Sequence, residues 1–110
     1  MYKIKGNIWI EGDSGAFIGL GRVVLLEGIK KHGSITSAAK AMKMSYRQAW
    51  ELVSSMNKQA RKVLVETVSG GAGGGGTKIT PEGEKAIKLF RDLNKRFVEF
   101  SEKESKDLKI

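Results

Sequence analysis

Residues 33–56, GSITSAAKAMKMSYRQAWELVSSM, decide the fold of this 110-residue chain. Ser34 is a residue type that caps helix N-termini, and the apolar positions after it predict a short helix, Ile35–Ala41. The small side chains of Ala38 and Ala39 allow another helix to cross close to its backbone.

A second helix is predicted to follow after a tight turn. Ser45 supplies its N-cap, and apolar residues at positions 49, 52, 53 and 56 keep helical spacing on one face from Tyr46 to about Arg61. Only residues 42–44 separate the two helices. A helix, a tight turn and a second helix predict a helix-turn-helix motif over about residues 34–61.

The segment before this motif predicts a hairpin and a helix. Residues 2–10 alternate between apolar and polar side chains, which is typical of a half-buried strand, and a turn then leads to a short strand, Ala16–Ile18. From Leu20 to His32 the apolar spacing becomes helical, and Gly33 supplies a C-terminal stop.

The segment after the motif predicts a wing. A β-branched run, residues 63–68, is followed by a glycine-rich tip and a return strand, residues 77–79, so two strands span about residues 63–80. Together these elements predict one mainly α domain with a small β component (α+β) over residues 1–110. Its architecture is a winged helix-turn-helix with an N-terminal β-hairpin and a long C-terminal helix.

That final helix, predicted over about residues 81–104, carries an apolar seam. Thr80 caps it and Pro81 fits its first turn, while the tail from Lys103 is expected to be frayed. Packing of the seam on the chain's own core is one interpretation. Three aromatic residues exceed what so small a core absorbs, which favours a homodimer. The residues expected at its interface recur at heptad-like spacing: Phe90, Leu93, Phe97 and Phe100.

The net charge of +8 is concentrated in one third of the chain. Between Lys30 and Lys62 there are eight basic residues and a single acidic residue, Glu51. A concentrated positive field suits a polyanion, because neutralising phosphates releases condensed counterions. A solvated basic face is the alternative interpretation.

Several classes of function find no support in the composition. The chain has no Cys and one His, and it shows no paired carboxylates or nucleophile arrangement, so neither an enzyme, a cofactor nor a metal site is expected. The glycine run lacks the Gly-Lys-Ser/Thr ending of a phosphate-binding loop. No apolar run approaches the ~20 residues that span a bilayer. The N-terminus is not a secretory signal, which makes the cytoplasm the expected location.

Two motifs resemble a known family. The run Gly33–Lys40 with Ser-Tyr-Arg-Gln-Ala-Trp at residues 45–50, and the glycine-rich run 70–76 with Thr-Lys-Ile-Thr after it, are similar to the N-terminal DNA-binding domain of ModE. ModE proteins are molybdate-responsive bacterial regulators whose winged helix resembles that of LysR-type regulators. The resemblance covers about residues 2–100 and implies a transcriptional regulator that binds double-stranded DNA as a homodimer.

ModE proteins continue into molybdate-binding domains that carry a Ser-Ala-Arg-Asn motif. This sequence contains no such motif. The resemblance therefore implies a stand-alone DNA-binding domain, and direct molybdate binding is not expected.

The second helix of the motif is expected to enter the major groove with its N-terminal end. Arg47 can donate two hydrogen bonds to guanine O6 and N7; a phosphate contact or a solvated side chain is its alternative. Trp50 either packs against the hairpin or contacts the groove. The residues expected to contact bases are Ser45, Tyr46, Arg47, Trp50 and Ser54.

Phosphate contacts are expected around this helix. Hydroxyl and N–H groups at the start of the preceding helix suit an anion, although capping alone explains Ser34. Glycines would let the wing tip approach the DNA backbone, with a lysine near the wing base. The expected set is Ser34, Thr36, Ser37, Lys43, Lys58, Arg61, Gly73, Gly74 and Lys78.

Two other functions fit the same sequence. A nucleoid-type protein that binds DNA without sequence preference would also need the basic segment. A winged helix used as a protein-interaction module would need no DNA at all. Protection of one inverted repeat distinguishes a specific regulator from the first, and the absence of any binding to duplex DNA identifies the second.

Overall fold

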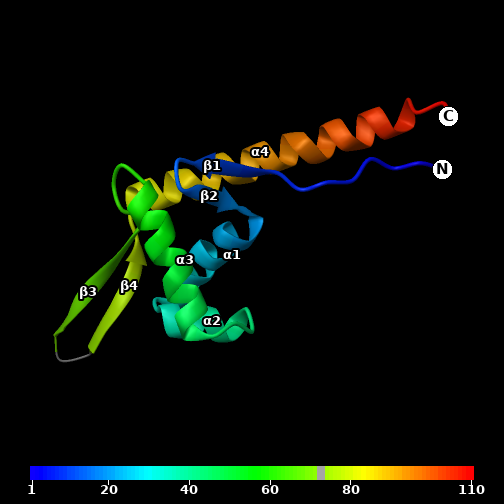
Figure 1. Cartoon of the computed structure of the whole chain (residues 1–110). Coiled ribbons are helices and arrows are strands. Elements are labelled where there is room, and N and C mark those ends of the chain that lie inside the picture. Colours follow the sequence, from blue (N-terminus) through cyan, green and yellow to red (C-terminus); the bar gives the residue numbers. More distant parts are fainter. Residues whose placement is uncertain (72–73) are drawn as a thin grey trace.

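The computed structural model describes residues 1–71 and 74–110, apart from the side chains of residues 69–75. Four helices and two antiparallel two-stranded sheets follow one another along this part of the chain (Figure 1). Their order is β1 (Trp9–Gly12), β2 (Gly15–Gly19), α1 (Leu20–His32), α2 (Ile35–Ala41), α3 (Tyr46–Gln59), β3 (Val65–Gly71), β4 (Gly74–Ile79) and α4 (Pro81–Lys106). The α+β winged helix-turn-helix architecture is thus confirmed.

The N-terminal strand is much shorter than residues 2–10. Only Trp9–Gly12 pairs with β2, since β2 is five residues long and offers no partner further back. The preceding residues instead run along α4 (Figure 1). There the Ile4 N–H donates to Ser105 Oγ at 2.7 Å. Ile4 and Ile8 are partly buried and their neighbours exposed, so the alternation predicted the inward side of these two residues but not their partner. Tyr2, which the same alternation places on that side, is exposed.

The first two helices have the predicted ends because their caps are local. Gly33 adopts a left-handed conformation (φ 73°) and its N–H donates to the Ile29 carbonyl, which ends α1. Ser34 Oγ accepts a hydrogen bond from the Ser37 N–H at 3.0 Å and caps α2. Ser45 caps α3 in the same way, but α3 ends at Gln59, two residues before the predicted Arg61.

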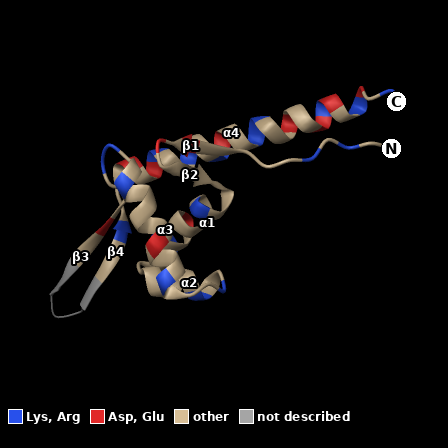
Figure 2. Cartoon of the chain, viewed as in Figure 1, with Lys and Arg blue, Asp and Glu red and all other residues tan. Residues whose placement is uncertain are grey.

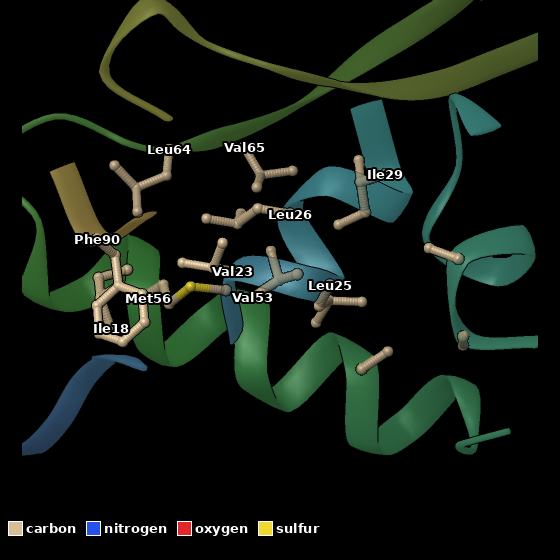
Figure 3. Packing of buried hydrophobic residues seen from close by; sticks show 13 residues of the cluster. Ile18, Val23, Leu25, Leu26, Ile29, Val53, Met56, Leu64, Val65 and Phe90 are labelled. Atoms are coloured by element: carbon tan, nitrogen blue, oxygen red, sulfur yellow. The ribbon is translucent and has the colours of Figure 1, made fainter. Parts of the chain in front are cut away.

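One hydrophobic core lies between the helices and the base of the wing (Figure 3). The predicted inner faces are confirmed: four residues of α1, Ala38 and Ala39 of α2 and three residues of α3 are buried. Phe90 points from α4 into the same cluster and is fully buried (0% exposed). Phe90 therefore has no surface to offer a second chain, which corrects its expected place at a dimer interface.

The wing is fastened to the domain at its base by Asn57. Its amide oxygen accepts from the N–H groups of Leu64 and Val65 at 2.9 and 3.2 Å, and its amide nitrogen donates to the Val65 carbonyl at 2.9 Å. These bonds begin β3 at Val65, two residues later than predicted. The strands also continue further into the glycine-rich run than predicted, to Gly71 and from Gly74.

The start of α4 packs against the same place. Thr80 Oγ1 donates to the Val63 carbonyl at 2.7 Å and accepts from the Gly83 N–H at 3.0 Å. A Cβ at Gly83 would lie 2.3 Å from the Leu64 carbonyl oxygen, so this buried position requires glycine.

Beyond Phe90, α4 extends away from the core with the N-terminal segment beside it, and both termini lie at this end (Figure 1). The helix continues to Lys106 and so includes residues that were expected to be frayed. No helix in the described parts of the chain has the length and apolar character needed to cross a membrane.

Candidate nucleic-acid interface

The N-terminal half of α3 presents a free face opposite its buried one. Ala49 and Val53 are buried against the core, while Tyr46 and Trp50, one turn apart, are 53% and 51% exposed. Ser45 is also exposed and begins the helix as its cap. The structure thus brings together the polar and aromatic residues that were predicted to contact bases.

Arg47 lies on the same turn and pairs with Glu51. Its Nε donates to Glu51 Oε1 at 3.1 Å, and the two side chains are 88% and 58% exposed. Neither side chain is held by the core, so both are accessible to a partner that approaches this face of α3.

Lys43 lies in the turn between α2 and α3 and adopts positive φ (57°), a rare conformation for a residue other than glycine. The turn closes through hydrogen bonds from the Lys43 N–H to the Lys40 carbonyl (3.1 Å) and from the Met44 N–H to the Ala39 carbonyl (3.0 Å). The exposed lysine side chain therefore lies next to the start of α3.

The start of α2 is largely occupied by the protein itself. The Ser37 N–H is bound to Ser34 Oγ, and the Ile35 N–H donates to Thr77 Oγ1 of the wing at 3.2 Å. The hydroxyls of Thr36 and Ser37 are on exposed residues. A phosphate at this place would meet hydroxyl groups more than free backbone N–H groups.

The wing is bound to the helix-turn-helix through Thr77. Besides the bond to α2, the Thr77 N–H donates to the Gly33 carbonyl at 2.9 Å. Lys78 pairs with Glu66 on the opposite strand (Nζ–Oε1 3.5 Å), so this lysine is partly neutralised. Gly74 begins β4, whereas Gly73 lies outside the described residues.

Three of the predicted contact residues lie further along α3 or beyond its end. Lys58 is eleven residues, or roughly 16 Å of helix, from Arg47, and Arg61 follows the helix. Ser54 and Lys58 line an open groove of about 460 Å³. Trp50 of α3 and Asp13 of the β1–β2 turn line the same groove. The structure therefore does not group Lys58 and Arg61 with the N-terminal turn of α3.

Basic residues follow the side of the molecule that carries α2, α3 and the wing base, while α4 alternates basic and acidic residues (Figure 2). The basic segment of the sequence thus lies along α2 and α3, with basic residues at both ends of α3. The same side of the molecule also holds the exposed end of α3.

The remaining members of the predicted dimer seam lie on the extended part of α4. Leu93 and Phe97 are partly buried, and Phe100 is 56% exposed. Val98 on the neighbouring face is also exposed. An apolar surface is thus present on this helix, although it excludes Phe90.

Two residues that position the site were not assigned a role from the sequence. Asn57 and Thr77 fix the wing relative to α3 and α2, and their partners lie 7 to 44 residues away in the chain. A polar residue at the end of an apolar helix and a threonine after a glycine run carry no local signal of such contacts.

No protein-family model matches the chain. Among curated proteins, it is 36% identical over 91 residues to the molybdenum transport protein ModE of Azotobacter vinelandii, which covers 83% of this chain and 34% of that protein. It is 41% identical over 69 residues to the DNA-binding transcriptional dual regulator ModE of Escherichia coli, covering 63% of this chain and 26% of that protein. The chain thus spans about a third or less of the length of these relatives.

A solved structure of a MarR family transcription regulator superposes with a TM-score of 0.58 at 21% identity, over 77% of this chain and 58% of that one. At this identity the likeness concerns the fold, and it agrees with the winged helix described above. Taken with the sequence matches, it identifies the chain as a winged-helix domain of the ModE family, corresponding to the N-terminal region of those regulators.

Proposed function

We propose that this chain binds double-stranded DNA at specific sites, as a homodimer, and thereby regulates transcription. The observation that carries the proposal is the N-terminal half of α3, where Tyr46, Arg47 and Trp50 are exposed opposite a buried face. In helix-turn-helix proteins this end of the second helix enters the major groove. The names of the ModE relatives, which describe transcriptional regulators, point to the same function.

Around this helix we assign phosphate contacts to the exposed residues that flank it. Thr36, Ser37 and Lys43 adjoin its start. The wing residues Gly74 and Lys78 would contact the DNA backbone separately from α3. Lys58 and Arg61 lie at the far end of α3 and would contact phosphates further along the duplex. Ser45 and Ser54 complete the proposed base contacts.

The homodimer is proposed to form through the extended part of α4. Leu93, Phe97 and Phe100 give this helix an apolar face that its own chain covers only in part. A two-fold arrangement would place two α3 helices in successive major grooves, about 34 Å apart, on a pseudo-palindromic site.

Selection of bound sites from a random duplex pool tests this function. The wild-type chain is expected to enrich one inverted repeat whose half-sites are ~10 base pairs apart. Enrichment of no sequence despite tight binding would identify a non-specific nucleoid-type protein. Absence of binding to any duplex at low salt would identify a protein-interaction module. Either result contradicts the proposal.

Two variants distinguish recognition of a base pair from electrostatic attraction to the phosphates. Arg47→Ala should relax the preference at one base pair by about tenfold or more, because a bidentate contact to guanine is lost. Lys58→Ala should weaken binding to all duplexes alike and reduce the slope of log affinity against log salt by about one. Equal effects of the two variants on preference would count against Arg47 as a base-reading residue.

A further inference from the structure

Glu51 is an acidic side chain in a region that otherwise selects for positive charge. It is the single acidic residue between Lys30 and Lys62, and it is 58% exposed on the same face of α3 as Trp50 and Ser54. A carboxylate at this place repels the phosphates of DNA. Its presence therefore needs a compensating interaction.

The compensating interaction is its bond to Arg47. An arginine has five N–H donors, one on Nε and four on the two Nη atoms. The bond to Glu51 Oε1 uses Nε, at 3.1 Å. Among the described residues, no hydrogen bond occupies the Nη groups of Arg47. The two Nη atoms form the fork that meets O6 and N7 of guanine end-on.

We propose that Glu51 is a positioning residue that holds Arg47 through Nε and presents its Nη fork to a guanine. The inference rests on the proposed function and specifies how its main base contact is made. A long, exposed arginine loses rotamer freedom when it binds, and a second fixed bond reduces that cost for the one orientation that reads guanine. The spacing of four residues on α3 places the two side chains one above the other.

The bond and the charge of Glu51 have opposite effects on DNA binding, and this makes them separable. Glu51→Ala removes both the acceptor and the charge. Glu51→Gln removes the charge but keeps an amide oxygen that can accept from Nε. Both variants should bind all duplexes more tightly. Only Glu51→Ala should relax the preference for guanine, by about threefold to tenfold, at the base pair that Arg47→Ala also affects.

The experiment is site selection followed by titration of the best site and its single-base variants. It compares the wild type with Glu51→Ala, Glu51→Gln, Arg47→Ala and the Arg47→Ala/Glu51→Ala double variant. Glu82→Ala is the matched control, since Glu82 forms a similar exposed pair with Lys85 on α4. At the guanine position the double variant should behave like Arg47→Ala alone.

Four results would overturn the inference. Glu51→Ala could keep the full preference at the Arg47 position, or change it only at another base pair, which would make Glu51 a direct reader of cytosine. Glu51→Gln could lose as much preference as Glu51→Ala, which would make charge the cause. If the wild-type chain selects no site, the proposed function fails and the inference with it; if it does select one, the variants test Glu51 alone.

Discussion

Two regions of this molecule differ in how far they bury their apolar side chains. In the body, residues 9–90, the inward-facing apolar side chains of the hairpin, the first three helices and the wing base converge on one core, which extends from Ile18 to Phe90; Tyr46 and Trp50 are exposed on the opposite face of α3. In the arm, residues 1–8 with 91–110, the side chains of Tyr2, Val98 and Phe100 stay exposed. Within the arm, the hydrogen bond from the Ile4 N–H to Ser105 Oγ joins the N-terminal segment to α4.

An apolar pattern specifies which face of an element is to be covered, but not which chain covers it. In the body, the inward-facing part of the apolar pattern is covered within the chain, so it can be interpreted as a core. In the arm, the same kind of pattern is left partly uncovered, which is the condition under which a second chain contributes to stability. The proposed homodimer would cover the apolar face of the arm with a second chain, as the body covers its own apolar face within one chain.

Phe90 and Phe100 lie on one helix and provide the sharpest comparison of the two regions. Phe90→Ala should lower the free energy of unfolding by about 3–5 kcal/mol, because it leaves a cavity in a close-packed core. Chemical denaturation followed by circular dichroism measures it, and Phe90→Leu should lose less. A loss below about 1 kcal/mol for Phe90→Ala would show that this residue does not belong to the core as described.

The helices of the body were predictable because their ends depend on neighbouring residues. Gly33, Ser34 and Ser45 set the ends of α1, α2 and α3 through bonds to residues three or four positions away. The N-terminal strand was not, since a strand exists only where another strand pairs with it. The heptad-like spacing of α4 likewise identified an apolar face. It did not show that Phe90 belongs to the core of its own chain while Leu93, Phe97 and Phe100 lie outside it.

Asn57 connects α3 to the wing through contacts in the body that no local sequence pattern predicts. Asn57→Ala should cost about 1–3 kcal/mol, because it leaves polar backbone groups of Leu64 and Val65 without their partner. Relative to the wild type, the variant should show faster hydrogen exchange at the Leu64 and Val65 amides and little change in α2. Unchanged exchange at these amides would mean that the wing is fixed by other contacts.

The site was predictable to a similar degree. The sequence identified the exposed turn of α3, since Ser45 caps the helix and its apolar positions leave Tyr46 and Arg47 on the other side. It assigned Lys58 and Arg61 to phosphate contacts as basic residues around the helix, and the length of α3 separates them from that turn. The contacts of Thr77 with α2 join parts of the chain that no local pattern relates.

Phe100 tests the arm. Phe100→Ala should change the unfolding free energy of the isolated chain by less than about 0.5 kcal/mol, since the side chain is exposed. It should raise the concentration at which dimers form by about tenfold, as expected for loss of an apolar interface contact of about 1.4 kcal/mol. Sedimentation over a range of concentrations measures this. A wild-type chain that stays monomeric throughout would contradict the proposed role of the arm.

The smallest effect is expected where the body meets the arm, at the ion pair of Glu27 on α1 with Arg91 on α4. Arg91 Nε and Nη2 donate to the Glu27 carboxylate at 3.0 and 2.6 Å. These hydrogen bonds hold the pKa of Glu27 below its ordinary value; burial opposes the shift, and the charge of Arg91 adds to it. A lowered pKa in the folded state means that the pair contributes stability above the unfolded pKa of about 4.3.

That contribution disappears as the pH falls through the folded pKa and the carboxyl group takes up a proton. Both side chains are more than a third exposed, so screening by solvent limits the effect to at most about 1 kcal/mol. Wild type and Glu27→Gln should therefore differ slightly in unfolding free energy at pH 7 and become equal at low pH. A difference that persisted or grew below the folded pKa would show that Glu27 stabilises the junction through packing and not through its charge.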